Sequence, residues 1–329
     1  MKLYPLLFEP NLHSVVWGGN KLNAWKKLPP ANKPIGESWE VSAVPSSIDI
    51  IANGELAGKD LVTVISAYPD EILGKNVAKE NNNQLPLLVK FIDAQRDLSI
   101  QVHPNNEMAH RVHNKLGKTE MWYIIDAQPG SYLYSGFKKE ITKEEYKERI
   151  NNGTICDVLA KHEVKPGDVF YIPSGRVHAI CSGILLAEVQ QSSDVTYRIF
   201  DYNRPGMDGK PRELHTELAA EALNFKVADN YRTEYSFTPN TANTIIDSKY
   251  FNVRIIETDK KFHCDLIKND SFVIAMCIKG DCKIKTSNDC EILLKEGFSC
   301  LIPAAIADYD IIPDNKDGKT KVLDAYIAK

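Results

Sequence analysis

The spacing of apolar residues is the feature that most constrains how this chain can fold. Most apolar runs in its 329 residues are short, alternate with polar residues and stop at Gly, Pro, Asn or Asp. Runs of this kind lie at 87–92, 121–125, 169–172, 184–189, 272–276 and 322–327. Such runs are typical of antiparallel strands, and many of them separated by turn residues predict a sandwich or barrel. We therefore expect an all-β-dominated fold with a few short helices.

Two segments predict helices, and a third predicts a domain boundary. Thr142 and Glu145 have the capping-box spacing at the start of a helix of roughly two to three turns. Residues 213–223 contain good helix formers with apolar i, i+4 spacing, and this helix would close the first domain. The polar, aperiodic segment 231–243 predicts a linker. The expected organisation is a domain at 1–230 with short helical insertions and a smaller domain at 244–329.

A short internal repeat predicts two related barrels. Gly167–Pro173 contains a glycine turn, an apolar strand and a final Ile-Pro, and Gly297–Pro303 repeats that order. Proline is tolerated at a strand end because the ladder does not need its missing N–H there. Continuing in register, Asp308 falls at the position of His178. We therefore expect a metal site built on His178 to belong to the first domain alone.

Charge and cysteine content exclude several classes of function. The formal net charge is −4 without long runs of one sign, so neither nucleic acid nor an anionic membrane is an expected partner. The seven cysteines contain no C-x-x-C pair, which predicts structural thiols in a reducing compartment. No apolar run approaches the roughly 18–20 residues that would span a bilayer, and the apolar N-terminal stretch is short and broken by Pro5. We expect a cytoplasmic protein.

Four side chains predict a metal site through their spacing on strands. Gln101 and His103 lie two residues apart, so on a strand they project from the same face, and a proline then ends that strand. Glu120 follows a glycine turn, and a Pro-x-Gly-x-x-His turn delivers His178 into a later strand. Two imidazoles, one carboxylate and open positions suit a catalytic zinc ion and would also suit Fe(II). The amide of Gln101 is the weakest of the four expected ligands.

Other interpretations of these residues stay open at this point. Lys118 and Glu120 share a strand face and, taken alone, would equally be a surface ion pair. A lone histidine is more often packed in a core than bound to a metal. His110 and His113 lie three residues apart in a segment with the pattern of a short exposed helix, and we expect them to be solvated rather than to form a second metal site.

With these motifs in view, the chain resembles the type I mannose-6-phosphate isomerases in their short bacterial form, which are zinc-dependent cupins. The resemblance covers the first two-thirds of the chain and rests on residues 36–42, 98–104, 117–120, 173–180 and 188–198. It implies two cupin domains of jelly-roll type, the second smaller and without metal. It also implies that one zinc ion per chain is bound by Gln101, His103, Glu120 and His178.

The same resemblance implies a catalytic set around the zinc. Arg198 would be catalytic with Asp194 in the same site, and Glu188 and Lys118 match positions for proton transfer or substrate contact. Departures from the family's pattern fall at residues that are not expected ligands, so only the pocket rim is in doubt: Asn105, Asn106, Ser174 and Arg176.

The resemblance, together with these residues, implies a zinc-dependent aldose–ketose isomerase that interconverts D-mannose 6-phosphate and D-fructose 6-phosphate through an enediol(ate). The reaction needs a Lewis acid, a proton-transferring base and a cation. Glu188 is the first choice of base, because burial would raise its pKa, and Lys118 is the second. Arg198 would stabilise the enediolate, and Asp194 would orient Arg198. The phosphate has four candidate contacts, which are Ser99, Lys118, Arg198 and Lys90.

Two alternatives compete with this prediction. Another metal-dependent cupin enzyme, acting on a different sugar phosphate or as an iron-dependent dioxygenase, would use similar ligands, and metal analysis would separate the two. A non-enzymatic sugar-binding or regulatory cupin would lack a ligand or Arg198, and this chain has them all. The sequence carries no signal for the oligomeric state.

Overall fold

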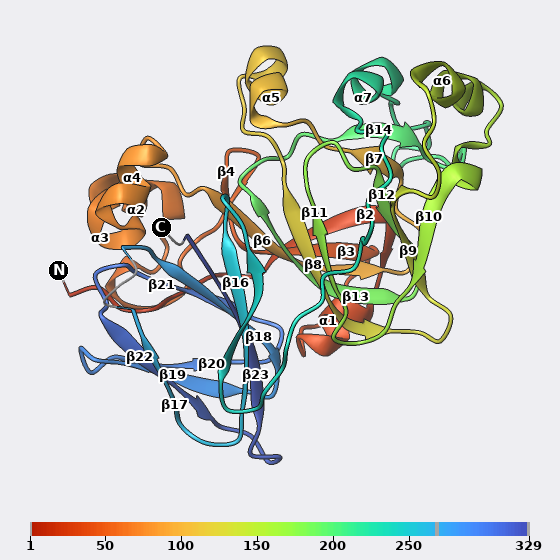
Figure 1. The fold of residues 1–329 in the computed structure, drawn as a ribbon. Helices are drawn as coiled ribbons and strands as arrows, with labels where there is room; N and C mark the ends of the chain where they lie inside the picture. The colour runs from red at the N-terminus through yellow and green to blue at the C-terminus, as the bar shows by residue number, and fades with distance from the viewer. Residues whose placement is uncertain (1, 267–269, 328–329) are drawn as a thin grey trace.

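The structure is a computed structural model that describes residues 2–266 and 270–327, and it contains two β-sandwiches lying side by side (Figure 1). In the first sandwich a six-stranded sheet faces a five-stranded sheet. In sheet order, the larger sheet contains β11 (Val169–Ile172), β8 (Glu120–Ala127), β13 (Ile184–Gln191), β6 (Leu87–Ala94), β3 (Ile35–Val41) and β2 (Asn11–Gly19). The smaller contains β10 (Leu159–Glu163), β9 (Tyr132–Phe137), β12 (His178–Ile180), β7 (Ile100–Val102) and β14 (Tyr197–Phe200).

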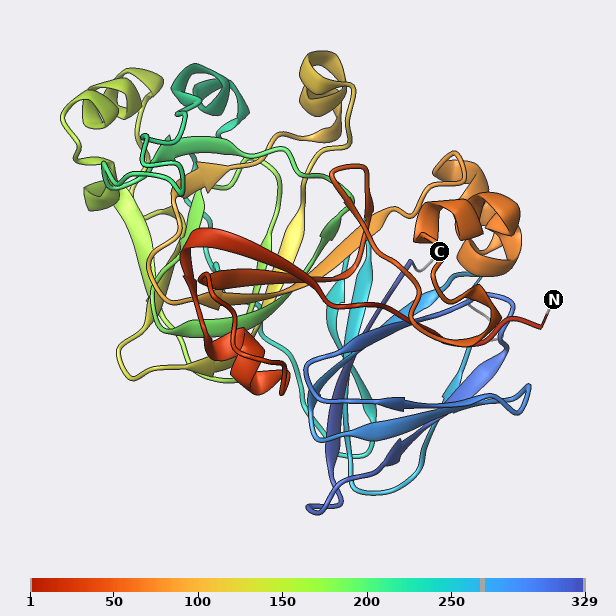
Figure 2. The same cartoon turned by 180° about the vertical axis from the view of Figure 1, so that it is seen from behind.

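The second sandwich repeats this plan with a six-stranded and a four-stranded sheet. The larger sheet contains β1 (Leu6–Leu7), β21 (Ser299–Ile302), β18 (Val273–Lys279), β23 (Thr320–Tyr326), β16 (Asn252–Thr258) and β15 (Ala242–Asp247). The smaller contains β17 (Phe262–Asp265), β22 (Asp308–Pro313), β19 (Cys282–Thr286) and β20 (Glu291–Leu294). Strand β1 pairs Leu6 with Leu301, so the N-terminal segment starts in the second sandwich and then runs into the first (Figure 2).

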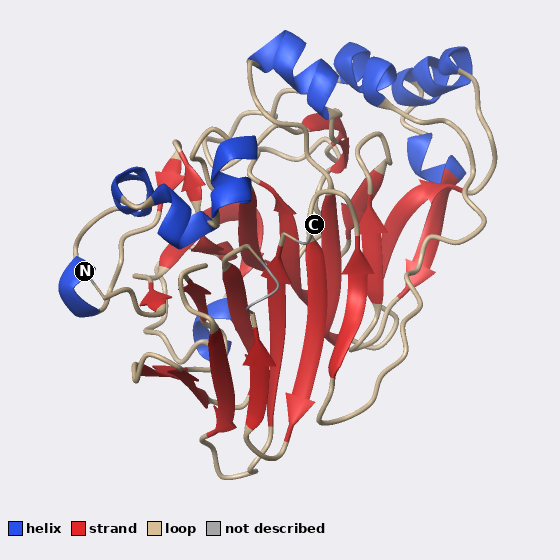
Figure 3. Ribbon diagram, turned by 60° about the vertical axis from the view of Figure 1, so that its left-hand side comes forward, coloured by secondary structure: helices blue, strands red, loops and turns tan. Residues whose placement is uncertain are grey.

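The helices are short and gather in two places. Helices α5 (Asn106–His113), α6 (Lys143–Asn151) and α7 (Thr216–Ala222) lie at one end of the molecule (Figure 3) and pack on the outer face of the five-stranded sheet. Helices α2 (Leu61–Ala67), α3 (Pro69–Leu73) and α4 (Lys75–Glu80) pack beside the second sandwich, and α1 (Lys21–Trp25) follows β2. A two-stranded hairpin, β4 (Ala43–Val44) with β5 (Ser47–Ile48), completes the sheets. No helix in the described part of the chain is long and apolar enough to cross a membrane.

The two sandwiches share one hydrophobic core, and this arrangement determines which side chains face the site. Val89 and Phe91 of β6 pack in a single cluster with Ile274 and Leu323 of the second sandwich. Because side chains alternate along a strand, the intervening Lys90 faces the interior of the first sandwich. All eight residues of β6 are buried, including the charged Lys90 and Asp93.

Most of the expected elements are present, and the fold class is confirmed as mostly β. Thr142 caps α6 by accepting a hydrogen bond from the Glu145 N–H at 3.1 Å. The predicted helix 213–223 begins only at Thr216, because the Glu213 carbonyl accepts a hydrogen bond from the Arg198 side chain and the His215 N–H donates to the Arg198 carbonyl in β14. His110 and His113 lie on the exposed helix α5, as predicted.

The predicted linker and the internal repeat also take definite form. The segment before β15 is irregular but bound to the first sandwich, because Tyr231 is buried and its hydroxyl donates to Phe137 O at 2.8 Å. The two repeat segments become β11 and β21, each in the larger sheet of its sandwich, and each is followed by a strand of the smaller sheet that starts at His178 or Asp308. The domain limits at 230 and 244 stay a prediction.

Candidate metal centre and substrate pocket

Two facing rows of side chains build the site inside the first sandwich. In the five-stranded sheet, His178 of β12 and Arg198 of β14 are both register partners of Gln101 on β7. In the six-stranded sheet, Glu188 of β13 is the register partner of Lys90 on β6. Register partners on one sheet face present adjacent side chains, so each row presents its polar groups to the space between the sheets.

Tight local turns deliver the remaining groups. His103 follows β7 directly, and Glu120 is the first residue of β8. Gly117 precedes Glu120 where the chain passes so close to Asn105 that an added Cβ would lie 2.5 Å from its carbonyl carbon. Gly175, with φ +85°, forms the turn before His178, and a side chain there would be strained.

His103, Glu120 and His178 form a buried triad, with ligand atoms that all lie within 4.8 Å of one another. The Glu120 Oε2 lies 3.3 Å from His103 Nε2, and the Glu120 Oε1 lies 3.4 Å from His178 Nε2. Two imidazole nitrogens and one carboxylate facing a common point form a donor set that suits zinc or another divalent transition metal. The structure thus brings together three of the four predicted ligands as a metal-binding arrangement.

Backbone carbonyls hold both imidazoles in the tautomer that a metal requires. Val195 O lies 3.0 Å from His103 Nδ1, and Arg176 O lies 2.9 Å from His178 Nδ1. A carbonyl oxygen only accepts, so each Nδ1 carries the proton and each Nε2 presents its lone pair to the triad. Burial lowers the pKa of His103 to about 3, with a further contribution from the Lys118 ammonium, and burial also lowers the pKa of His178. Both rings are therefore neutral near pH 7.

The surroundings of the Glu120 carboxylate indicate whether a cation fits the triad. The side chain is fully buried, yet neither oxygen accepts a hydrogen bond of ordinary geometry from any residue in the described ranges. Burial would raise the pKa of Glu120, but the Lys118 ammonium, 3.0 Å from Oε2, and the two imidazoles lower it well below its usual range. A buried, ionised carboxylate with unused lone pairs is costly unless it coordinates a cation.

Gln101 lies beside the triad in a different orientation from that of a ligand. Its Nε2 is 3.2 Å from His178 Nε2, and its Oε1 is 3.4 Å from Ser99 Oγ. A half-turn of the amide would present the oxygen, the atom that can bind a metal, to the triad. Ligation by Gln101 stays a prediction.

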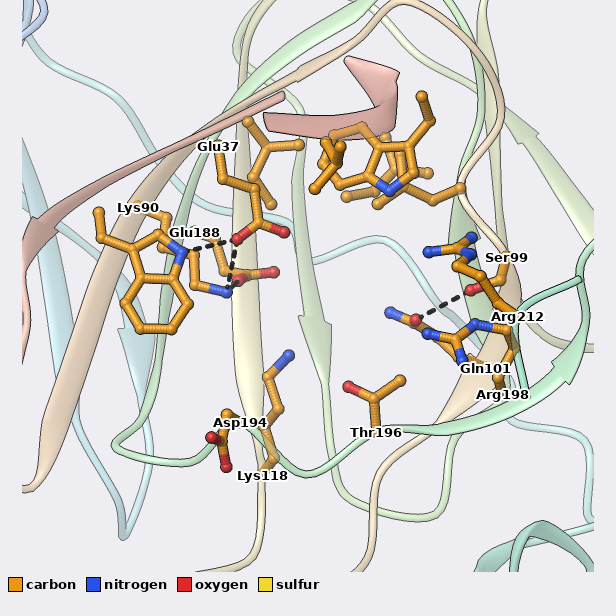
Figure 4. Close-up of a pocket in the computed structure, with 16 residues that line it drawn as sticks. Glu37, Lys90, Ser99, Gln101, Lys118, Glu188, Asp194, Thr196, Arg198 and Arg212 are labelled. Carbon is orange, nitrogen blue, oxygen red and sulfur yellow. Dashed lines mark hydrogen bonds and ion pairs between the residues drawn. The ribbon is translucent and has the colours of Figure 1, made fainter. Parts of the chain in front are cut away.

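A cavity of about 310 Å³ opens beside the triad and is lined by residues of both rows (Figure 4). Lys118 and Gln101 line it next to the triad, and the aromatic side chains of Trp17 and Trp39 also line it. None of the departures noted in the sequence lines this cavity: Asn105, Asn106, Ser174 and Arg176. Arg176 instead donates to Tyr171 O at 2.6 Å.

One end of the cavity holds two carboxylates and an ammonium. Lys90 Nζ lies 3.3 Å from Glu37 Oε2 and 3.4 Å from Glu188 Oε1, as Figure 4 shows. Trp122 Nε1 donates to Glu188 Oε2 at 2.9 Å, whereas Glu188 Oε1 accepts no hydrogen bond within the residues described. Burial raises the pKa of Glu188, and the charge of Glu120 adds to this effect against the opposing charges of Lys118 and Lys90.

The opposite end of the cavity holds two arginines. Arg198 and Arg212 lie beside Ser99 and Gln101 there (Figure 4). Arg198 donates from Nη1 to Glu213 O at 2.8 Å, and its buried Nε has no hydrogen-bond partner among the described residues. The cavity is therefore polarised, with acidic groups at one end and guanidinium groups at the other.

Asp194 lines the cavity but does not orient Arg198 as expected. Its carboxylate accepts from Lys115 Nζ at 2.6 Å and from Ser46 Oγ at 3.4 Å. Arg198 is held instead by the Glu213 carbonyl. The expected contact between Asp194 and Arg198 is absent from the described residues, because two loops supply Lys115 and Ser46 as partners for the carboxylate.

Glu37 and Arg212 are the charged lining residues that sequence reasoning missed, and Lys90 has a different setting from the one expected. Glu37 and Trp39 are two residues apart on β3, and their shared face was a usable signal. Lys90, expected as a phosphate contact, is paired with two carboxylates. Arg212 ends a polar loop with no periodicity, so its position depends on the folded loop.

Comparison with protein families gives two matches along the chain. The family model of the type I phosphomannose isomerase catalytic domain matches residues 6–145. The family model of the mannose-6-phosphate isomerase cupin domain matches residues 240–315. These two matches fall in the first and second sandwich respectively, apart from the N-terminal strand.

Individual relatives match over longer stretches. A probable mannose-6-phosphate isomerase of Bacillus subtilis, GmuF, is 42% identical over 254 residues, which cover 76% of this chain and 78% of that protein. The mannose-6-phosphate isomerase ManA of the same organism is 33% identical over 314 residues, with 94% and 96% covered. A crystal structure of the mannose 6-phosphate isomerase from Bacillus subtilis superposes with a TM-score of 0.87 at 30% identity and covers 98% of this chain and 99% of that one.

Proposed function

The chain belongs to the type I mannose-6-phosphate isomerase family of enzymes, and on that premise we propose that it interconverts D-mannose 6-phosphate and D-fructose 6-phosphate with one bound zinc ion. Family membership implies a sugar phosphate as substrate. The observation that carries the proposal is the buried triad of His103, Glu120 and His178 beside a cavity with charged groups at both ends.

His103, Glu120, His178 and Gln101 would hold the zinc ion. When bound, zinc supplies a Lewis acid that polarises the sugar carbonyl and stabilises the negative charge of the enediolate. The neutral imidazoles support this assignment, and so does the Glu120 carboxylate, whose oxygens accept no hydrogen bond within the described residues. The carbonyls of Val195 and Arg176 keep the two rings oriented.

The proton transfer is assigned to Glu188. Isomerisation moves one hydrogen from C2 of the aldose to C1 of the ketose and moves a hydroxyl proton from O2 to O1. Glu188 Oε1 is buried and accepts no hydrogen bond in the described chain, so it is available to take the C2 proton and return it at C1. Its raised pKa is nearer to the working pH, which favours both halves of the transfer. Lys118, 3.0 Å from Glu120 Oε2, is the second candidate.

Arg198 is assigned to the enediolate. Its guanidinium is permanently charged, it lies next to Gln101 in the row of the five-stranded sheet, and its buried Nε is free to donate. A preorganised cation aimed at a developing oxyanion stabilises the transition state more than the ground state. Asp194 lines the cavity and is expected to contact the substrate rather than Arg198.

A coupled assay with parallel metal analysis tests the proposal. The purified protein is expected to contain one zinc ion per chain and to convert mannose 6-phosphate to fructose 6-phosphate. Chelation should abolish turnover, and added zinc should restore it. Full activity in protein shown to be free of metal would contradict the zinc role. Bound iron in place of zinc would contradict the proposed metal. Turnover of another aldose phosphate, with none of mannose 6-phosphate, would contradict the proposed substrate.

A further inference from the structure

The loop after β14 brings two arginines together. The chain reverses directly after Asp201 because Tyr202 and Asn203 both adopt left-handed backbone conformations, with φ of 56° and 52°. Pro205 and Pro211 then form an antiparallel bridge that closes the loop. As a result Arg204 and Arg212, at the two sides of this bridge, return to the carboxylate at the end of β14.

Asp201 binds both guanidinium groups. Its side chain is buried, and Arg212 donates from Nε to Oδ2 and from Nη2 to Oδ1, both at 2.7 Å. Arg204 donates to Oδ1 from Nε at 3.1 Å and from Nη2 at 2.8 Å. A bidentate pair fixes the plane of the Arg212 guanidinium. Within residues 2–266 and 270–327 nothing accepts a hydrogen bond from Arg212 Nη1, and Arg212 lines the cavity.

The charges at this end of the cavity do not balance. Arg204 and Arg212 contact the Asp201 carboxylate. Arg198 lies near all three, whereas the other nearby carboxylate, Glu213, is largely exposed to solvent, so positive charge is in excess. Burial lowers the pKa of Arg198, and repulsion from Arg212 and Arg204 adds to that effect. A phosphate monoester carries about −1.5 to −2 charges near pH 7, so it would neutralise this excess.

The other end of the cavity offers no excess of positive charge to a phosphate. Glu37 and Glu188 lie there, and their charges are offset by Lys90 and Lys118. A sugar phosphate would therefore enter in one direction, with its phosphate toward the arginines and its reacting carbons toward Glu188. Lys90 is excluded as a phosphate contact because its ammonium is already shared by two carboxylates.

We propose that Arg212 binds the substrate's phosphate group and that Asp201 is the positioning residue that aims it into the cavity, an inference that rests on the proposed isomerase function. Arg212 uses two of its donors on Asp201 and offers Nη1 to a phosphate oxygen. Asp201 touches no substrate and acts through Arg212. Arg198 keeps its separate role at the enediolate.

The first test uses Arg212→Gln in the zinc-loaded protein. Loss of a charge-assisted contact to phosphate should raise KM for mannose 6-phosphate by roughly 10- to 100-fold and change kcat by less than about threefold. The affinity for inorganic phosphate, measured by calorimetry in phosphate-free buffer, should fall at least tenfold. The matched control is Arg111→Gln, which removes an exposed arginine of α5 outside the cavity and should change neither quantity.

The second test addresses positioning. Asp201→Asn keeps the side-chain size but removes the charge that holds Arg212, so KM should rise by roughly 3- to 10-fold with kcat unchanged, and Arg212→Lys should retain part of the phosphate affinity. A merely structural defect would lower kcat or metal content as well.

Two results would overturn the inference. Arg212→Gln could bind inorganic phosphate as tightly as the unaltered protein, or it could lower kcat at an unchanged KM. Arg212→Gln carries this test whether or not the Asp201 variant folds. If the unaltered protein turned over no sugar phosphate but lost phosphate affinity on Arg212→Gln, the proposed function would fail while the anion site would stand.

Discussion

Lys90 and Glu188 are register partners across β6 and β13, and the Lys90 ammonium lies 3.4 Å from Glu188 Oε1. The same ammonium lies 3.3 Å from Glu37, so one buried cation serves two carboxylates. Burial alone would lower the pKa of Lys90, but Glu37 and Glu188 raise it, which keeps the ammonium charged. The charge state of the proposed base therefore depends on a residue that the sequence suggested for phosphate binding.

Removing the Lys90 charge should shift the pH dependence of the reaction. Lys90 is among the groups that hold down the raised pKa of Glu188, so Lys90→Gln should raise that pKa further. A base must be deprotonated to act, so the acidic limb of the kcat profile should move to higher pH, with a loss of rate at acidic pH that recovers at alkaline pH. Lys161→Gln, at an exposed position on β10, is the control. An acidic limb that does not move would argue against Glu188 as the base.

His178→Ala and Arg198→Ala should separate metal binding from turnover. His178→Ala removes one predicted ligand from the triad, so zinc content and activity should be lost together. Arg198→Ala leaves the triad intact and should retain full zinc content while kcat falls by about 10²- to 10³-fold. Metal analysis and the coupled assay on the same samples measure both. A wild-type rate in Arg198→Ala would show that its assigned role is wrong.

Zinc should also stabilise the folded protein. A ligand that binds only the native state at about 100 times its Kd adds about 2.7 kcal/mol to the free energy of unfolding. Zinc should therefore raise the melting temperature of the unaltered protein and of Arg198→Ala but not of His178→Ala. Equal shifts in all three would place the stabilising zinc outside the triad.

Asp49 should make stability depend on pH independently of the metal centre. Burial raises the pKa of Asp49 to about 7, although Asn11 and the Ser42 N–H both donate to the carboxylate. Above pH 4 the unfolded chain releases this proton while the native state keeps it, so the stabilising contribution is complete below about pH 4 and is lost as pH rises through 7. The full effect is on the order of 4 kcal/mol.

Asp49→Asn, which is neutral at every pH, isolates that contribution. Its free energy of unfolding relative to the unaltered protein should increase steadily between pH 4.5 and 7.5, as measured by denaturant titration. A difference that is constant over this range would mean that the Asp49 carboxyl is already ionised in the native state at pH 4.5.

Lys26 should couple the two sandwiches energetically. Its buried ammonium donates to Glu40 in the first sandwich and to the Gly297 carbonyl in the second. Lys26→Met removes the cation paired with Glu40, to which Ser38 Oγ still donates, and should cost about 3–5 kcal/mol of stability. Lys27→Met, at the exposed neighbouring position, should cost less than about 0.5 kcal/mol. Unfolding followed by two probes, one in each sandwich, should remain a single transition in the control.

Local patterns were sufficient to predict the strands and the triad. The two-residue spacing of Gln101 and His103 places both on one strand face, and a single turn directs His178 into its strand. Neighbouring residues therefore determine where these side chains point. The late start of α7 could not be predicted, because Glu213 and His215, which precede it, form hydrogen bonds with Arg198, a residue distant in sequence.

The distribution of charge in the cavity depends on contacts between residues distant in sequence, so local sequence patterns did not predict it. Lys90 resembles a solvated strand lysine until β6 is covered by the second sandwich on its outer face. Arg212 is positioned by the closure of its loop and by hydrogen bonds to Asp201. Asp194 accepts a hydrogen bond from Lys115, which lies in another loop. Each of these pairings joins segments whose proximity exists only in the folded chain.

The pairing of Leu6 in β1 with Leu301 in β21 has a consequence for folding during synthesis. β1 is translated before the first sandwich, but its partner strand is translated long after that sandwich is complete. Strand β1 therefore has no strand partner while the first sandwich leaves the ribosome. A nascent chain stalled before β21 would expose the apolar face of β6 and its neighbours, which makes it a substrate for chaperones.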